Sequence, residues 1–323
     1  MKITVLSGGV GGARFLRGLR SHIRSSAHTS VDTITAVVNT GDDMWLTGLR
    51  IAPDLDSIMY TLAGENDEVR GWGRVGETER VSGELRAYGV GWPWFTLGDL
   101  DIGTHLARTS MLRDGLTLSQ ATDRITSRWP LGVRLIPATD DDVETHVVVE
   151  DGSSMHFQEW WTRHRATLAA KRFVQRGVEA ARPAPGVLEA ITGADVVLLA
   201  PSNPVVSIGT ILGIPGIRDA VRETRARVVG VSPIIGGAVV RGMADACLTA
   251  IGVETSASAV AAHYGSRASG GLLDAWLIGD EDAALAPQVE AAGIRGVVVP
   301  LWMRDEPTSA TLAGAALAAA LRP

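Results

Sequence analysis

Short runs of apolar, largely β-branched residues alternate with segments of helical spacing along most of this 323-residue chain. The apolar runs are residues 3–6, 34–38, 147–149, 196–199, 228–231, 276–278 and 297–299. Such runs are typical of parallel strands that are buried on both faces. Because helical patterns lie between most of them, as at 13–23, 187–191, 243–251 and 308–321, the chain is predicted to be an α/β protein with a doubly wound, mostly parallel sheet.

Two stretches depart from this alternation. Residues 57–130 contain no convincing strand but several helical patterns separated by glycine-containing turns, which predicts a helical insertion. Residues 134–161 have the alternation and the Asp151-Gly152 turn of a β-hairpin insertion, and residues 163–185 look like a polar connection. Since no repeat and no long linker divides the chain, we expect one α/β domain over residues 1–323, with the helical insertion covering the site.

Charge and composition exclude several classes of partner. The chain has 36 acidic and 30 basic residues, a net charge of −6, and no block of lysine or arginine that could follow a nucleic-acid backbone. The single cysteine, Cys247, excludes an intrachain disulfide and fits a cytoplasmic protein. The short apolar start is unlike a signal peptide, and no apolar run is long enough to span a bilayer. We therefore expect no nucleic-acid or membrane partner.

The first candidate site is the glycine-rich loop after residues 3–6, because open α/β sheets bind ligands beyond the carboxyl ends of their strands. It contains Gly8, Gly9, Gly11, Gly12 and Arg14. Glycines let backbone N–H groups approach a ligand closely, and the helix N-terminus behind them favours an anion such as phosphate. The loop lacks the third glycine of the dinucleotide fingerprint and the Gly-Lys-Ser/Thr of a Walker loop. A tight turn that binds nothing is the alternative.

The second candidate site is acidic. Asp42 and Asp43 follow the apolar run 34–38, and Asp54 and Asp56 come shortly afterwards. Four carboxylates near one strand end repel one another unless a cation lies among them, and Mg²⁺ prefers carboxylate oxygens when it also holds a phosphate. The alternative is that these acids form a turn and cap a helix. If they bind a metal, Asp42→Asn or Asp56→Asn should abolish catalysis with little loss of stability.

Two further loops repeat the logic of the glycine loop. Ser202 and Asn203 follow residues 196–199, and Ser232 and Gly236 follow residues 228–231. Each loop taken alone is a helix cap or turn, but with the glycine loop they place three anion-binding turns on one sheet edge, which suits a diphosphate. Several tryptophans could stack on a flat ring, the alternative being core packing: Trp72, Trp92 and Trp94 in the helical insertion, and Trp160 and Trp161 near the hairpin.

These motifs together resemble a known family. The matching segments are residues 5–14, 38–43, 53–56, 97–105, 156–161, 201–204 and 232–236. They are similar to the 2-phospho-L-lactate transferases of coenzyme F(420) biosynthesis, and most of all to the actinobacterial type. The resemblance implies a Rossmann-like fold and a reaction in which the ribityl hydroxyl of the deazaflavin Fo attacks a guanosine diphosphodiester. GMP leaves, and the lactyl or enolpyruvyl phosphate remains on Fo as F(420)-0 or its dehydro form.

The resemblance also implies residue roles. Asp42, Asp43, Asp54 and Asp56 would hold Mg²⁺ and the Fo hydroxyl, with Asp56 or Asp42 catalytic. The guanylyl diphosphate would be held by Gly8, Gly9, Gly11, Gly12, Arg14, Asn39, Thr40, Ser202, Asn203, Ser232 and Gly236. A homodimer is expected as well. The chain departs from the family at Leu100, where arginine is usual, and at Gly103, where alanine is usual.

A competing interpretation is a regulatory protein, because related proteins with a similar Rossmann-like core bind a nucleotide sugar. A nicotinamide oxidoreductase is disfavoured, since Asn39 stands where a ribose-binding acid belongs.

Overall fold

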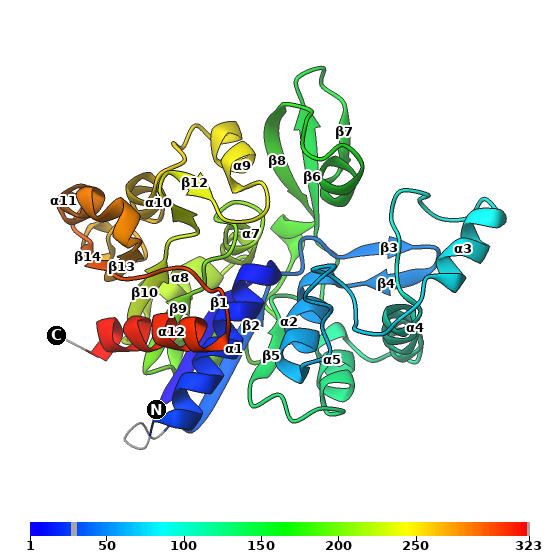
Figure 1. The fold of residues 1–323 in the computed structure, drawn as a ribbon, viewed down its shortest axis with the longest axis horizontal. Helices are drawn as coiled ribbons and strands as arrows, with labels where there is room; N and C mark the ends of the chain where they lie inside the picture. The colour runs from blue at the N-terminus through cyan, green and yellow to red at the C-terminus, as the bar shows by residue number, and fades with distance from the viewer. Residues whose placement is uncertain (27–30, 322–323) are drawn as a thin grey trace.

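A seven-stranded parallel sheet organises the computed structural model, which describes residues 1–26 and 31–321 (Figure 1). From one edge to the other the strands are β14 (Arg295–Val298), β13 (Ala275–Ile278), β10 (Arg227–Val231), β9 (Val196–Leu199), β1 (Lys2–Ser7), β2 (Thr33–Val38) and β5 (Arg134–Pro137). From β1 the chain passes to β2 and β5 on one side, and later to β9 and the remaining strands on the other. The doubly wound prediction is confirmed, and the order reverses between β1 and β9, where such sheets bind ligands.

Helices cover both faces of the sheet because side chains alternate along each strand. In β9, Val196 and Leu198 belong to one apolar core, and Val197 and Leu199 belong to the other. The first core is covered by α1 (Gly9–Ser25), α2 (Pro53–Ala63) and α12 (Glu306–Leu321). The second is covered by α6 (Val187–Thr192), α7 (Ile208–Gly213), α8 (Ile217–Glu223), α9 (Ala244–Ala250), α10 (Ala257–Tyr264) and α11 (Ala286–Ala291).

The segment after β2 is mainly helical, as its patterns predict. It contains α2 and then α3 (Arg80–Ala87), α4 (Asp99–Arg113) and α5 (Leu118–Thr126), on the right of Figure 1. It is preceded by a hairpin that the patterns did not indicate, β3 (Met44–Leu46) with β4 (Leu49–Ile51). The hairpin turns at Thr47 and Gly48, which both have positive φ as a two-residue turn of this kind requires.

The structure differs from the prediction for residues 134–185 in two respects. Residues 134–137 form β5, which pairs with β2 in the main sheet, so the hairpin itself is β6 (Glu144–Val149) with β7 (Ser154–His156). The supposed polar connection contains β8 (Ala170–Arg176), which pairs with β6 and completes a three-stranded antiparallel sheet. β5 has only four residues and ends in proline, while β8 is a partly exposed edge strand with charged residues, so neither shows a clear strand pattern. The apolar run 147–149 also belongs to this small sheet.

A last hairpin pairs β11 (Ile234–Ile235) with β12 (Ala238–Val239) beside the end of β10. No helix in the described part of the chain is both long enough and apolar enough to cross a bilayer.

Candidate functional site

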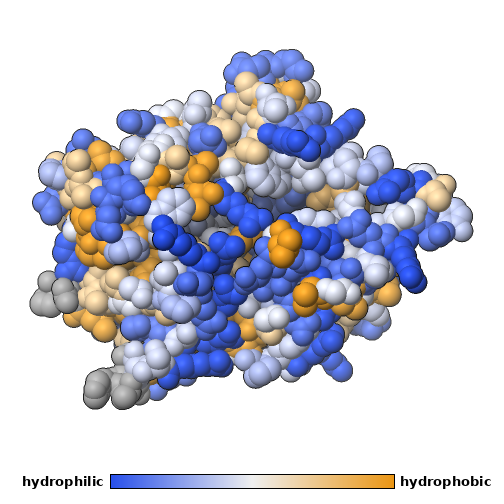
Figure 2. Space-filling view, in the orientation of Figure 1, coloured by the Kyte–Doolittle hydropathy of each residue, from blue (hydrophilic) through white to orange (hydrophobic). Residues whose placement is uncertain are grey.

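A cavity of about 830 Å³ opens beyond the carboxyl ends of β1, β9 and β10. Figure 2 shows this face hollowed near its centre, below the small antiparallel sheet, with hydrophilic residues around the opening. Its lining comes from all the loops that were singled out, together with residues of the helical segment after β2 and of the segment after β7. The predicted residues that line it are Gly8, Gly9, Gly11, Arg14, Asp42, Asp54, Asp56, Ser202, Asn203 and Ser232.

The glycine loop is fastened to the loop after β9 across the switch point. The Gly8 N–H donates to Ser202 Oγ at 3.0 Å, and the same hydroxyl donates to the Gly8 carbonyl at 2.8 Å. A side chain at Gly11 would collide with the Pro201 carbonyl, so glycine is required for this close approach. Gly9 has a φ of +60° and begins α1. The N-terminus of α1 therefore lines the cavity, where a helix end favours an anion.

Asp42 and Asp54 line the cavity without a lysine or arginine partner among the described residues. The Asn39 amide donates to Asp54 Oδ2 at 2.9 Å, while Asp42 Oδ1 has no hydrogen-bond partner. Burial, and then the charges of Asp54 and Asp43, raise the pKa of Asp42 well above its usual value. Burial also raises the pKa of Asp54 to about 6, although the Asn39 hydrogen bond acts to lower it. A cation placed here would relieve this repulsion.

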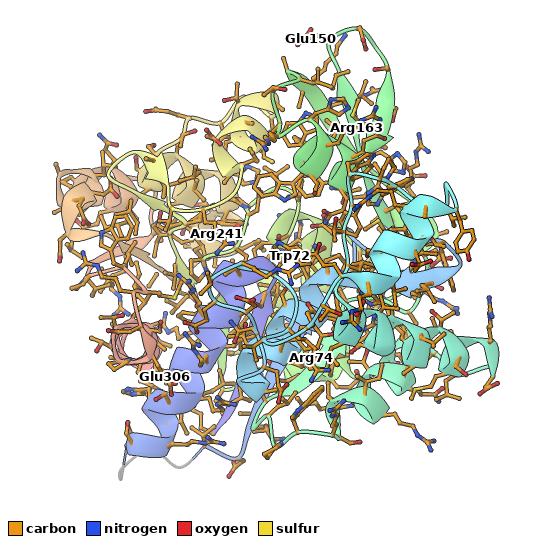
Figure 3. The ribbon with its side chains drawn as sticks, turned by 45° about the vertical axis from the view of Figure 1, so that its right-hand side comes forward. Trp72, Arg74, Glu150, Arg163, Arg241 and Glu306 are labelled. Atoms are coloured by element: carbon orange, nitrogen blue, oxygen red, sulfur yellow. The ribbon has the colours of Figure 1, made fainter. Side chains whose placement is uncertain are left out.

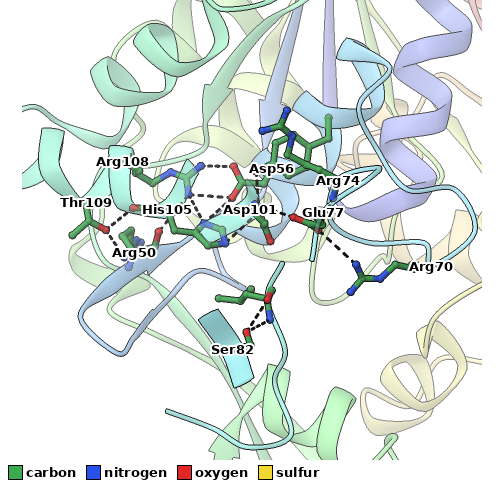
Figure 4. Close-up of polar contacts among 12 residues, drawn as sticks. Arg50, Asp56, Arg70, Arg74, Glu77, Ser82, Asp101, His105, Arg108 and Thr109 are labelled. Atoms are coloured by element: carbon green, nitrogen blue, oxygen red, sulfur yellow. Dashed lines mark hydrogen bonds and ion pairs between the residues drawn. The ribbon is translucent and has the colours of Figure 1, made fainter. Parts of the chain in front are cut away.

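Asp43 and Asp56 differ, because each has an arginine partner. Arg108 donates to both carboxylate oxygens of Asp56, with Nη1 at 3.0 Å from Oδ2 (Figure 4). Arg50 Nη2 lies 3.4 Å from Asp43 Oδ2, and Asp43 does not line the cavity. Burial raises the pKa of Asp43 to about 7, even though the charges of Arg50 and Arg108 lower it. The four acids therefore divide into two paired and two unpaired carboxylates.

Helix α4 contributes three functional candidates, Asp101, His105 and Arg108. The sequence analysis included Asp101 and His105 in the matching segment 97–105 without giving them a role, and it missed Arg108. Asp101 Oδ1 accepts from the Tyr60 hydroxyl at 2.8 Å and lies 3.3 Å from His105 Nε2, while His105 Nδ1 lies 3.4 Å from Asp56 Oδ2. Asp56, Asp101 and His105 are buried, and their ligand atoms lie within 4.8 Å of one another, so this group could hold a metal ion. Their spacing was the available signal, since residues three and four apart share one helix face.

The two departures from the family motif lie on other faces of α4. Leu100 is 44% exposed, and a side chain added at Gly103 would meet open space. Neither position disturbs the cluster of Asp101 and His105.

Five predicted residues do not line the cavity: Gly12, Asn39, Thr40, Asp43 and Gly236. Gly12 packs against Ser7, and the Gly236 N–H donates to an Asp282 carboxylate oxygen at 2.9 Å. Asn39 supports the site indirectly, because its amide bonds both Asp54 and the Gly41 N–H. Glycine and asparagine are also the residues that shape loops, so composition alone could not separate these roles.

The tryptophans divide in the same way. Trp72, Trp94 and Trp161 line the cavity. Trp92 instead stacks on Trp94, with ring centroids 4.7 Å apart. Trp160 is fully buried in the core, so the suggestion that it could stack on a ligand is wrong.

Comparison with known proteins identifies the family of the chain. The family model described as 2-phospho-L-lactate transferase CofD matches residues 3–297. A protein of Thermobifida fusca named phosphoenolpyruvate transferase is 56% identical over 99% of this chain and 98% of its own length. One of the same name from Streptomyces griseus is also 56% identical, over 98% of both chains.

Among solved structures, a Bacillus halodurans protein has a TM-score of 0.63 at 19% identity, over 98% of this chain and 99% of its own. At that identity the likeness concerns the fold, and it agrees with the α/β architecture described above. The family match and the relatives extend over nearly all of the sequence, and the chain therefore belongs to the 2-phospho-L-lactate transferase CofD family.

Proposed function

We propose that this protein transfers a phosphoenolpyruvyl group from a guanosine diphosphodiester to the deazaflavin Fo. Family membership makes it a transferase of coenzyme F(420) biosynthesis, and its relatives at 51–56% identity are named phosphoenolpyruvate transferases. The observation that carries the proposal is the meeting of the glycine loop with two unpaired acids, Asp42 and Asp54, at one switch point. Phosphoryl transfer chiefly requires positioning and charge neutralisation, and this arrangement is suited to both.

The proposed reaction replaces a phosphoanhydride bond with a phosphate ester bond. An oxygen–phosphorus bond forms between the ribityl hydroxyl of Fo and the phosphorus that carries the enolpyruvyl group. The bond from that phosphorus to the bridging oxygen breaks, GMP leaves with the bonding electrons, and the hydroxyl loses its proton. Of the two acids predicted as catalytic, Asp42 is the more available proton acceptor, because Oδ1 has no partner whereas both oxygens of Asp56 accept from Arg108.

The acids fit a Mg²⁺ ion. Mg²⁺ is commonly held by one or two carboxylates together with substrate phosphates, and Asp42 and Asp54 are two buried carboxylates with no other cationic partner among the described residues. Asp43 and Asp56 would not ligate the ion directly, because Arg50 and Arg108 already neutralise their charges. When bound, the ion would neutralise charge on the phosphates. The Asp56, Asp101 and His105 group is a less suitable place, because Arg108 already occupies Asp56.

The N-terminus of α1 would bind the diphosphate of the donor, with Arg14 and Ser202 beside it. Fo would lie against three of the tryptophans that line the cavity, Trp72, Trp94 and Trp161, whose broad apolar faces suit a flat ring. The helical segment after β2 would then act as the cover of the site. We also propose a cytoplasmic homodimer, which sedimentation of the purified protein would test.

Mass analysis of the product tests the function. The protein, Mg²⁺ and Fo are incubated with the enolpyruvyl or the lactyl donor, and we expect GMP and dehydro-F(420)-0 from the enolpyruvyl donor. If neither donor gave an Fo-derived product, the proposal would be contradicted. A nucleotide-sugar-binding protein remains the alternative, and it would be favoured if a UDP-sugar raised the melting temperature while GDP and Fo did not.

A further inference from the structure

The segment after β7 presents Arg165 to the cavity from an unusual backbone conformation. Residues 159–163 form a π-helix, a rare element that often occurs at functional sites. Arg165 and Ala166 follow with φ of +49° and +51°. Thr47, in the β3–β4 turn, is the one other described non-glycine residue with positive φ. Two consecutive side-chain-bearing residues in this region are unfavourable and persist only where surrounding contacts hold them.

Those contacts come from the core beneath the turn. The Ala166 N–H donates to the Trp160 carbonyl at 2.9 Å, and the Trp160 indole N–H donates to the Leu168 carbonyl at 2.7 Å. Trp160 itself is fully buried. The turn is therefore anchored on both sides of Arg165, whose exposed side chain lines the cavity.

The guanidinium of Arg165 has no hydrogen bond or ion pair with any described residue. Four arginines line the cavity, Arg14, Arg165, Arg241 and Arg304. Arg14 donates to the Met303 carbonyl at 3.4 Å, and Arg241 donates to the Gly71 carbonyl at 3.3 Å. Figure 3 shows Arg241 close to Trp72, the residue after Gly71. It also labels Arg163, which ends the π-helix two residues before Arg165. Arg165 thus brings an uncommitted positive charge to the cavity from the segment after β7.

Arg304 is the other cavity arginine that could bind an anion of the donor, but it lies on the side of the glycine loop. It follows Met303, whose carbonyl accepts from Arg14 of α1. The pKa of Asp305 is lowered first by its hydrogen bond from Thr308 and also by the charge of Arg304, although the Arg304 guanidinium forms no ion pair with a described residue. Arg304 is therefore placed beside the glycine loop, where the nucleotide diphosphate is expected.

We propose that Arg165 binds the carboxylate of the three-carbon acid group of the donor, an inference that rests on the function proposed above. The donor has two anionic parts, and the glycine loop accounts for the diphosphate. The carboxylate lies beyond the reacting phosphorus, on the side away from guanosine, so its partner must lie across the cavity from the glycine loop. Arg165 lies in the connection between β7 and β8, and Figure 1 places the small sheet formed by these strands and β6 opposite α1 and α12. A guanidinium matches a planar carboxylate with two parallel hydrogen bonds.

The test compares ligands that differ by that carboxylate. Arg165→Gln is assayed with Mg²⁺ and Fo for the KM of the enolpyruvyl donor, and for inhibition by GDP, which lacks the three-carbon group. We expect the donor KM to rise about 10- to 100-fold, as loss of a charge-assisted pair implies, with GDP inhibition unchanged. Arg304→Gln is the comparison variant, and it should not separate donor from GDP. An ethyl ester of GDP, without the carboxylate, should bind wild type and Arg165→Gln equally.

Two glycine variants test the strain. Arg165→Gly should raise the melting temperature by about 2 °C, because glycine tolerates positive φ. It should also raise the donor KM as much as Arg165→Gln does, because the guanidinium is lost. Ala166→Gly relieves the same kind of strain without removing the guanidinium, so its donor KM should match wild type. Lower melting temperatures in both glycine variants would overturn the strain argument.

The kinetic outcomes separate this inference from the proposed function. If wild type forms product and Arg165→Gln has an unchanged donor KM, the inference is wrong while the function stands. An equal loss of donor and GDP binding would place Arg165 at the diphosphate, and a rise in the KM of Fo alone would place it at the acceptor; either result overturns the inference. If wild type forms no product with Fo, the proposed function fails. Calorimetric titration of wild type and of Arg165→Gln with the donor and, separately, with GDP then tests whether Arg165 contributes to donor binding alone.

Discussion

Asp54→Asn and Asp56→Asn should change the stability of the metal-free protein in opposite directions. Asp54 is a buried carboxylate without a cationic partner, whereas Asp56 accepts from Arg108 on both oxygens. Asparagine at position 54 removes an unfavourable charge and can still accept from Asn39. Asparagine at position 56 leaves the Arg108 guanidinium buried beside a neutral amide. The expectation from the sequence, that Asp56→Asn leaves stability nearly unchanged, is therefore replaced by a large loss.

The magnitudes follow from the two environments. Burial raises the pKa of Asp54 from 3.8 to about 6, which corresponds to about 3 kcal/mol of lost stability once the carboxylate is ionised. Because the folded-state pKa is the higher one, this loss develops as the pH rises from about 4 through 6. Asp54→Asn should therefore gain up to about 3 kcal/mol at pH 7.5 and nothing near pH 3.5. Breaking a buried ion pair by removing one partner costs about 3–5 kcal/mol, which is the loss expected for Asp56→Asn.

Urea denaturation in the presence of EDTA measures the difference, followed by tryptophan fluorescence and circular dichroism. A gap of roughly 6 kcal/mol between the two variants corresponds to about 2 M in the midpoint at a slope of about 3 kcal/mol/M. Asp123→Asn, an exposed acid on α5, is the matched control and should not move the midpoint. Asp56→Asn combined with Arg108→Gln should recover part of the loss. Midpoints that shift in the same direction for both single variants would refute the division of the acids into paired and unpaired carboxylates.

Three further outcomes are expected. Ser202→Ala removes both bonds to Gly8 and should raise the donor KM about 5- to 100-fold with unchanged Fo binding; steady-state kinetics with each substrate varied would show this, and an effect on Fo alone would contradict it. Trp94→Leu should weaken Fo more than GDP and reduce the quenching of tryptophan emission by Fo, whereas fully buried Trp160 should not respond to Fo in the same titration. Gly18→Val should lower the melting temperature by several degrees, because a side chain there would collide with the Ser309 backbone where α1 meets α12, and Gly83→Ala on exposed α3 is the control.

The main sheet and its ligand-binding edge could be predicted because buried parallel strands appear as continuous apolar runs. Strands β1, β2, β9 and β10 are almost entirely buried, and their loops follow directly. The same criterion missed β8, whose residues are mostly charged or half-exposed and whose pairing depends on the backbone of β6. The strand order could not be predicted from the sequence either, because β1 pairs with β9 through residues nearly two hundred positions apart.

The acids could be identified by their placement, but their partners could not. Asp56 and Arg108 lie 52 positions apart, on α2 and α4, and no sequence period relates them. A local signal did exist for α4, where Asp101, His105 and Arg108 recur at helical spacing. That spacing indicates that the three side chains share one face of α4, but it does not indicate which residues that face contacts.

The origin of the two arginines explains why the acids differ. Arg50 belongs to β4 and Arg108 to α4, so both cations come from the segment inserted after β2, whereas Asp42 and Asp43 come from the loop at the end of that strand. The inserted segment therefore supplies the charge that allows Asp43 and Asp56 to be buried, and it leaves Asp42 and Asp54 unpaired beside the glycine loop. A weakened contact between α4 and α2 would expose the ion pair of Asp56 and Arg108 before it disturbed the sheet. The integrity of this helical segment and the charge of the proposed metal site are thus coupled through two buried ion pairs.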